Sequence, residues 1–352
     1  MQRLSQEEIR WIQEHKYLTS HYEIVKRFND FFRTDKTWKS LEHQWYKNKT
    51  VEPKDEKYEY FKSLESATHE QIPITPCTKG SEASIIALFS DLHYGKEVCA
   101  EKIENLNHYD SLTAKARAGH FFASLLKLYK IVRRDIVVKN IVLGILGDLI
   151  DGYLRNESRE SNSLSPTESV LEVRDILISG IDFLLNNTDL YITIPCVIDN
   201  HGRTTEKIEI SRQAENSYAW LLYQWLAEHY KNHKRIKFVV GRGDYVYQDI
   251  YDIKCRFWHG HQFKYNGGVG GIFIPLLRHI DKLNNAKHAD IDFLAHYHQT
   301  FIHRRFIVNG SILGYDEYAF HKGLEFEPPQ QFFGLLDKDR KRITLSAPLF
   351  LT

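Results

Sequence analysis

Short apolar segments alternate with longer amphipathic segments along the chain after residue 81. The apolar runs predict strands at 84–90, 140–146, 190–198, 236–240, 252–258, 290–295 and 302–308, and a terminal hairpin at 331–336 and 343–347. Helical periodicity predicts helices at 112–134, 168–186, 214–229 and 272–284. Strands that alternate with helices predict an α/β layered fold, with a functional site at the carboxyl ends of the strands.

The first fifty residues follow a different pattern, which predicts three short helices with a tight middle turn. This arrangement fits a helix-turn-helix unit at 1–50 that binds DNA. The segment has ten basic and seven acidic residues, and its last helix is the basic one. The cations expected to contact DNA phosphates are Lys36, Lys39, Lys47 and Lys49. The alternative is a helical cap that joins copies of the chain into a homo-oligomer.

Residues 51–80 are polar, with prolines near both ends, and predict a linker before a large domain at 81–352. The net charge of +1 excludes a chain that is polybasic throughout, so any nucleic-acid surface must be local. The sequence has neither an apolar export segment nor an 18-residue apolar run, so no membrane association is expected. Its four cysteines are far apart, which favours reduced thiols in a cytoplasmic protein.

The stretch FSDLHYG, residues 89–95, ends the first apolar run with an acid and an imidazole. Side chains of a strand alternate between its faces, so Asp91 and His93 are expected to point the same way and to bind a metal ion together. The alternative is a plain turn, in which Asp91 caps the loop and His93 lies in solvent.

Four later apolar runs also end in metal-type residues. These ends contain Asp148 and Asp151, Asn200 and His201, His259 and His261, and His296 and His298. Five such ends in one domain are hard to explain as unrelated turns. Two cations held by a bridging carboxylate and by His, Asn and Asp side chains would hydrolyse a phosphate ester. The mixed nitrogen and oxygen donors favour Mn²⁺, with Fe, Zn²⁺ or Mg²⁺ as alternatives, and the lack of cysteine argues against a structural zinc site.

In chain order, these ends resemble the motifs of the calcineurin-like metallophosphoesterases: DxH, GDxxD, GNH(D/E), a lone His and GHxH. The resemblance covers about residues 84–310, points to the branch of repair nucleases and implies a four-layer αββα sandwich with two divalent metal ions. It implies that one ion binds Asp91, His93, Asp148 and His298, and that the other binds Asp148, Asn200, His259 and His296. It further implies that His201 is the general acid and that Asp151 orients it.

The sequence departs from these motifs at the third strand end, which reads Asp199-Asn200-His201-Gly202. Both the leading Gly and the closing acid are missing, which puts the turn geometry in question. His259 and His261 compete for one ligand position. His259 is preferred because it directly follows the strand, which leaves His261 as an outer or substrate-binding group.

The N-terminal segment resembles the small helix-turn-helix found beside phage and homing endonuclease domains, through residues 28–37 followed by Ser40 and Leu41. This resemblance implies a nuclease that acts on DNA, with Arg155 and Arg203 near the site to bind phosphates. The alternatives are a nucleotide or cyclic-nucleotide phosphoesterase, whose helical unit serves oligomerisation, and an inert DNA-binding regulator. The presence of every metal-ligand position argues against the inert protein.

Overall fold

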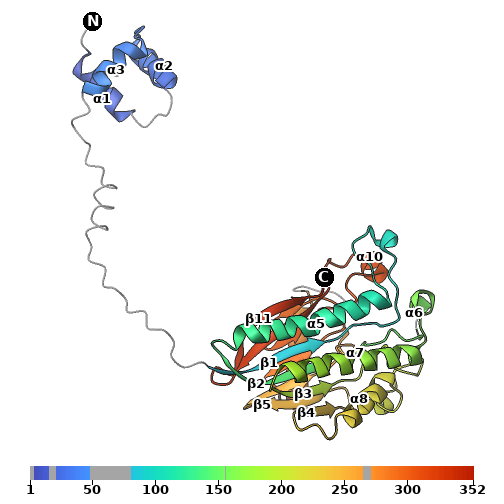
Figure 1. Cartoon of the computed structure of the whole chain (residues 1–352). Coiled ribbons are helices and arrows are strands. Elements are labelled where there is room, and N and C mark those ends of the chain that lie inside the picture. The colour runs from blue at the N-terminus through green and yellow to red at the C-terminus, as the bar shows by residue number, and fades with distance from the viewer. Residues whose placement is uncertain (1–3, 16–20, 48–80, 155, 265–270) are drawn as a thin grey trace. The chain divides into compact units, whose positions relative to one another are not determined.

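The computed structural model describes residues 4–15, 21–47, 81–154, 156–264 and 271–352. The chain packs as two units, Met1–Pro76 and Cys77–Thr352 (Figure 1). The predicted linker at 51–80 lies outside the described residues, as do Arg155 and Lys49, and the side chain of Lys47 is not described either.

In the N-terminal unit, the described residues form α1 (Gln6–Glu14), α2 (His21–Phe32) and α3 (Trp38–Lys47). A capping box begins α1, because Ser5 and Glu8 satisfy each other's backbone N–H groups. The buried side chains of Trp11, Phe28 and Leu41, one from each helix, form its small core. The helix-turn-helix assignment stays a prediction.

The first sheet of the larger unit has the strand order β11-β10-β1-β2-β3-β4. Its parallel strands are β1 (Glu82–Phe89), β2 (Val137–Ile145), β3 (Tyr191–Cys196) and β4 (Ile236–Val240). On the other side of β1, β10 (Gln330–Asp337) pairs antiparallel with β1, and β11 (Arg342–Phe350) pairs antiparallel with β10. One face packs on α5 (Ser111–Val132), α7 (Pro166–Asn187) and α8 (Tyr218–His229). Figure 1 shows α5 and α7 lying across this face.

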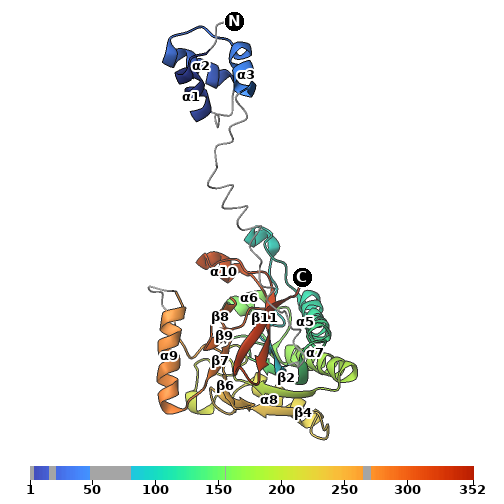
Figure 2. The same ribbon diagram turned by 90° about the vertical axis from the view of Figure 1, so that its left-hand side faces the viewer.

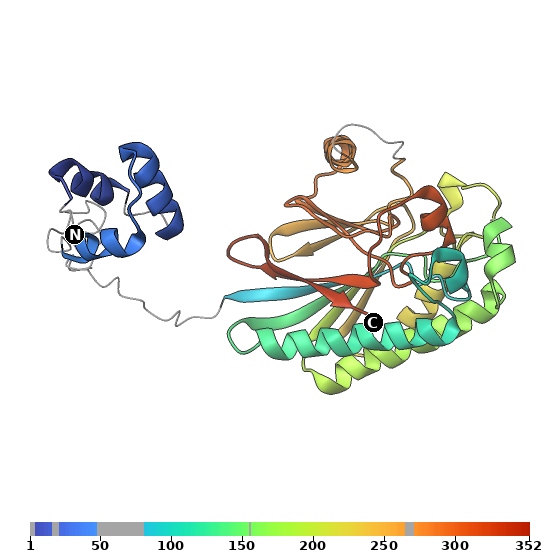
Figure 3. The same ribbon diagram turned by 90° about the horizontal axis from the view of Figure 1, so that it is seen from above.

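The second sheet has the order β5-β6-β7-β9-β8. Its strands are β5 (Val246–Ile250), β6 (Ile253–Phe257), β7 (Ile291–Leu294), β8 (Phe301–Ile302) and β9 (Phe306–Val308). The outer face packs on α9 (Phe273–Ala286). Figures 2 and 3 show α9 on the opposite side of the two sheets from α5 and α7.

Strand β1 reads as a continuous apolar run because both of its faces are buried. Ile85 and Phe89 pack toward the helices, whereas Ile86 and Leu88 pack between the two sheets. Helices therefore cover both outer faces of the paired sheets, and the predicted α/β fold with four αββα layers is confirmed.

Some elements differ from the sequence prediction. The segment 302–308 is not one strand, since β8 and β9 form an antiparallel pair within it, and β5 was not predicted. Helix α8 begins at Tyr218 instead of 214, because the Ser217 side chain accepts the Trp220 N–H as an N-cap. The short helices η1 (Ala100–Ile103), α6 (Asn156–Ser161), η2 (Ile210–Arg212) and α10 (Glu317–Lys322) are too short to show periodicity. Within the described parts of the chain, every helix is too short or too polar to cross a membrane.

Candidate metal centre

The predicted donor residues lie in the loops that follow β1, β2, β3, β6 and β7. Many of them have left-handed backbone conformations, which side chains other than glycine adopt only at a cost. These residues are Asp91 (φ 52°), His93 (φ 45°), Asp148 (φ 47°), His296 (φ 75°) and His298 (φ 55°). Strain of this kind gathers at functional sites, where the surrounding structure holds it in place.

The expected reason for the convergence of Asp91 and His93 was wrong. Strand β1 ends at Phe89, so neither residue is part of an extended strand and strand alternation does not orient them. Both are in left-handed turns, and the backbone N–H of His93 donates to the carbonyl of Asp148 (2.9 Å). The turn and its bond to the neighbouring loop bring the two side chains together.

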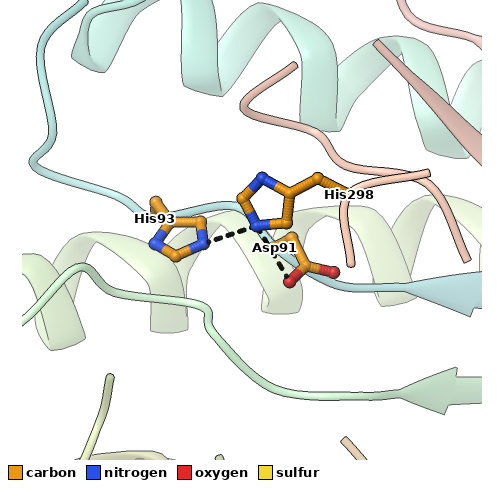
Figure 4. A group of neighbouring side chains, drawn as sticks. All are labelled: Asp91, His93 and His298. Atoms are coloured by element: carbon orange, nitrogen blue, oxygen red, sulfur yellow. Dashed lines mark hydrogen bonds and ion pairs between the residues drawn. The ribbon is translucent and has the colours of Figure 1, made fainter. Parts of the chain in front are cut away.

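The first group of donors contains Asp91, His93 and His298 (Figure 4). His298 Nε2 lies 3.2 Å from His93 Nε2 and 3.4 Å from Asp91 Oδ1. Asp91 and His93 are buried, and His298 is partly exposed. The three donor atoms therefore face one small volume that is open on the side of His298.

The second group contains Asp148, His259 and His296. His259 Nε2 lies 3.0 Å from Asp148 Oδ2 and 3.2 Å from His296 Nδ1. The same Asp148 oxygen is 3.8 Å from His93 Nε2 of the first group. Asp148 is thus within reach of both groups, as a bridging carboxylate must be.

Two neighbouring acceptors determine which nitrogen of each imidazole faces the centre. His259 Nδ1 donates to the Leu146 carbonyl (2.7 Å), and His93 Nδ1 donates to Asp151 Oδ1 (2.9 Å). A carbonyl or carboxylate oxygen can only accept, so the Nε2 atom of each ring is left for the centre. Metal-binding histidines commonly have this arrangement.

The charges of the centre lower the pKa of Asp148 and raise the pKa of His259. Burial alone would raise the pKa of Asp148, but the imidazoles of His259 and His201 hold it well below its ordinary value. Burial would lower the pKa of His259, but Asp148 more than offsets this effect and raises it to about 9. The contact between Asp148 and His259 therefore calls for a positive charge, either a proton or a cation.

Unpartnered polar atoms provide an independent test of whether cations fit. The buried polar atoms that have no hydrogen-bond partner among the described residues include Asp91 Oδ1, Asp151 Oδ2 and both side-chain polar atoms of Asn200. Such atoms are costly unless a ligand satisfies them. Asn200 directly precedes His201, whose backbone N–H donates to Asp148 Oδ1 (3.1 Å), so its loop borders the second group. These residues fit divalent cations.

His201 forms a third group of possible donors with His93 and Asp148, and it lies next to Asp151. His201 Nδ1 donates to the Asp151 carbonyl (2.8 Å) and lies 3.1 Å from Asp151 Oδ1. His201 Nε2 lies 4.0 Å from Asp148 Oδ2. Asp151 thus orients His93 and His201 at the same time, with Nε2 of His201 on the side of Asp148.

The other predicted residues have different surroundings. His261 is outside both groups, with its ring centroid 5.5 Å from that of His259, and its buried Nδ1 has no described partner. Burial lowers the pKa of His261 to about 3. The Arg203 guanidinium donates to the backbone carbonyls of its own loop, at Asn200, Thr205 and Glu206. It braces that loop, and the expectation that it binds phosphate has no support from these contacts.

Two of the lysines expected to bind DNA are in the described region with their side chains. Lys36 Nζ forms an ion pair with Glu8 Oε1 (2.5 Å), which joins the turn before α3 to α1. Lys39 is exposed on α3. Lys36 therefore has a structural partner within its own unit.

Several residues that support the centre carry no motif that would reveal them. Ser90 Oγ donates to Asp91 Oδ2 (2.6 Å), and Asn309 Nδ2 donates to Ser90 Oγ (2.8 Å). Asp199 stands where the resembled motif has a glycine, and its side chain accepts the backbone N–H of Asp148 (2.8 Å). In the sequence, only its acidic side chain beside Asn200 could have indicated this supporting role.

No protein-family model and no curated protein sequence matches this chain. Solved structures that are similar to it include Vps29 from Entamoeba histolytica complexed with zinc, at 11% identity over 75% of this chain and 99% of that chain, with a TM-score of 0.32. A hypothetical protein from Pyrococcus horikoshii has 13% identity over 75% and 87% of the two chains and a TM-score of 0.34. A phosphatase from Mycoplasma pneumoniae has 13% identity over 77% and 93%, with a TM-score of 0.30. Because every one of these TM-scores is below 0.5, function is inferred from the chain's own residues.

Proposed function

We propose that this chain is a metal-dependent phosphoesterase that binds two divalent cations. One observation carries the proposal: two groups of His and Asp donors lie side by side, and the Asp148 carboxylate is within 4 Å of imidazoles in both. Paired cations about 3.5–4 Å apart, joined by a shared ligand, are the common design for hydrolysis of phosphate esters. Four buried carboxylates in these loops supply the negative charge that such cations need, namely Asp91, Asp148, Asp151 and Asp199.

The proposed ligands of the first cation are Asp91, His93, Asp148 and His298, and those of the second are Asp148, Asn200, His259 and His296. Bound there, the cations would neutralise phosphate oxygens and activate water for attack. The donor set of imidazole, carboxylate and amide favours Mn²⁺, with Fe, Zn²⁺ and Mg²⁺ as alternatives.

His201 is proposed to protonate the leaving oxygen of the ester. Its Nδ1–H donates to Asp151, so Nε2 is the nitrogen that can hold or release a proton on the side of the centre. The Asp151 carboxylate stabilises the protonated ring and keeps its orientation. In the same way, Asp151 keeps the Nε2 atom of His93 toward the first cation.

The finer proposal is a phosphodiesterase that acts on DNA, with Lys39 and the basic end of the helical unit contacting phosphates. A second candidate is a phosphatase of nucleotides or other small phosphate esters. The contacts of Lys36 with Glu8 and of Arg203 with backbone carbonyls favour this second candidate, because both of these basic side chains already have partners within the chain. The helical unit would then serve another purpose, such as association of copies.

Hydrolysis with and without metal tests the proposal. Full-length protein stripped with a chelator and reloaded with Mn²⁺ would be given bis(4-nitrophenyl) phosphate, 4-nitrophenyl phosphate, single- and double-stranded DNA, RNA and cyclic nucleotides. We expect Mn²⁺-dependent hydrolysis that Asp148→Asn abolishes and Asp337→Asn retains. Asp337 is a suitable control because it is buried in the same sheet but pairs in register with Ala83, at the opposite end of β1 from the centre.

The substrate that is cleaved distinguishes the two candidate functions. Cleavage of DNA supports the nuclease, and cleavage of small esters with intact DNA supports the phosphatase. Equal hydrolysis by stripped and reloaded protein would contradict a metal-dependent enzyme.

A further inference from the structure

Asp199 has a buried carboxylate, but it is not among the proposed ligands of either cation. It lies in the loop after β3 and is 3% exposed. Its Oδ2 accepts the backbone N–H of Asp148 (2.8 Å), and its Oδ1 accepts the backbone N–H of Gly202 (2.7 Å). One side chain therefore joins the loop after β2 to the loop after β3.

The two loops are also joined in the reverse direction. The backbone N–H of His201 donates to Asp148 Oδ1 (3.1 Å). The backbone of Asp148 is thus held by a side chain of the other loop, and its carboxylate is held by the backbone of that loop. Asp148 has a left-handed conformation (φ 47°), which is unfavourable at a residue other than glycine, and the bonds to Asp199 and to the His201 backbone help to hold it.

The chain leaves room for Asp199 on both sides. A Cβ atom at Gly147 would lie 2.5 Å from the Asp199 Cβ, and a Cβ atom at Gly202 would lie 2.8 Å from Asp199 Oδ1. Gly147 also has a positive φ of 92°. The carboxylate therefore occupies a place shaped by two glycines, one in each loop, and a larger residue at either position would displace it.

We propose that Asp199 is a positioning residue that sets the Asp148 carboxylate between the two cation sites. It acts through the backbone of Asp148 and through the turn at Gly202, and it is not itself a ligand. The sequence lacks the acid that follows His in the resembled motif, and Asp199 supplies a carboxylate from the other side of the Asn200–His201 pair. The inference rests on the proposed two-cation function.

The test compares Asp199→Asn and Asp199→Gly with Asp337→Asn in the full chain. Asp337 is a matched control because it is also buried and its carboxylate also accepts two backbone N–H groups, from Asp339 and Arg340. Asparagine keeps the size of Asp199 but offers a single acceptor oxygen, and glycine removes both acceptors.

Hydrogen exchange and calorimetric titration measure the effect of the Asp199 substitutions. Hydrogen exchange of the metal-free protein should become faster at the amides of both Asp148 and Gly202 in Asp199→Gly, and at one or both of them in Asp199→Asn, with the rest of the domain unchanged. Calorimetric titration with Mn²⁺ should give affinities 10- to 100-fold weaker, the usual loss for a group that supports a metal ligand. Asp337→Asn should have wild-type exchange at Asp148 and wild-type Mn²⁺ affinity.

Wild-type exchange at Asp148 together with wild-type Mn²⁺ affinity in the Asp199 variants would overturn the inference. Faster exchange across the whole domain would overturn it too, since that result means general loss of stability. Failure of the proposed function is a separate result. A wild-type protein that hydrolyses no phosphate ester, or binds no Mn²⁺, refutes the function, whereas local exchange at Asp148 still decides the role of Asp199.

Discussion

Replacement of Asp292 by asparagine should destabilise the larger unit much more than the same replacement at an exposed ion pair. Arg256 on β6 is fully buried, and its Nε and Nη2 donate to Asp292 Oδ1 (2.6 Å) and Oδ2 (2.9 Å) on β7. The Trp258 indole also donates to Asp292 Oδ1 (2.9 Å). Asparagine keeps the shape of Asp292 but leaves the guanidinium charge without its counter-charge.

Loss of one partner from a buried ion pair costs roughly 3–5 kcal/mol, because the remaining charge stays away from water. Arg256 would keep neutral acceptors at the Lys287 carbonyl (3.2 Å) and at Asn284 Oδ1 (3.0 Å). We therefore expect the lower part of that range, about 3 kcal/mol in the free energy of unfolding.

The control is Asp281→Asn, which removes the partner of Arg305 at a site where the Asp281 side chain is 60% exposed. An exposed pair of this kind contributes about 0–1 kcal/mol. Urea denaturation followed by circular dichroism, with a chelator present for all variants, measures both changes. Equal and small losses for Asp292→Asn and Asp281→Asn, with unchanged urea dependence, would refute the reasoning about buried charge.

Four further changes test the centre and the helical unit. Asp148→Asn should lower metal occupancy at both sites and Asn200→Ala at one, as measured by elemental analysis, and loss of a single metal in Asp148→Asn would exclude a bridging role. His201→Ala should retain both metals but lower the hydrolysis rate by about 10²–10⁴; metal loss in that variant would make His201 a ligand. Burial alone would raise the pKa of Glu8, but Lys36 and Ser5 hold it below its ordinary value of 4.5. Its stabilisation is therefore present above that pH and lost as pH falls below it, so Glu8→Gln should reduce the acid-dependent loss of hydrogen-exchange protection factors at 5–15.

Local patterns in the sequence were sufficient to predict most of the layered architecture. A strand segment buried on both faces must be apolar along its length, so β1 and the buried second half of β2 were recognisable without any knowledge of their neighbours. Strand β5 was not, because its sequence VYQDI mixes polar and apolar residues and depends on its pairing with β6. Strands β8 and β9 could not be separated either, because they pair with each other across a turn inside one apolar run.

The chemical identity of the candidate centre was also present in the sequence. Donor residues that directly follow strands are expected to gather at the carboxyl ends of those strands, which is why Asp91 and Asp148 of the first sheet and His259 of the second could be proposed from their positions. The choice of His259 over His261 follows the same rule, since His259 directly follows β6 and faces Asp148.

Tertiary structure alone decided how these donors are aimed and held. The bond that holds the left-handed turn at His93 and the link from Asp199 to Asp148 join loops that are far apart in the sequence. A residue's type shows which bonds it can make, but its partner is determined by which loops the folded sheets bring together. The sequence by itself therefore determined the layers and the donors, and only the folded chain decided their orientation, because hydrogen bonds between distant loops leave no local periodicity.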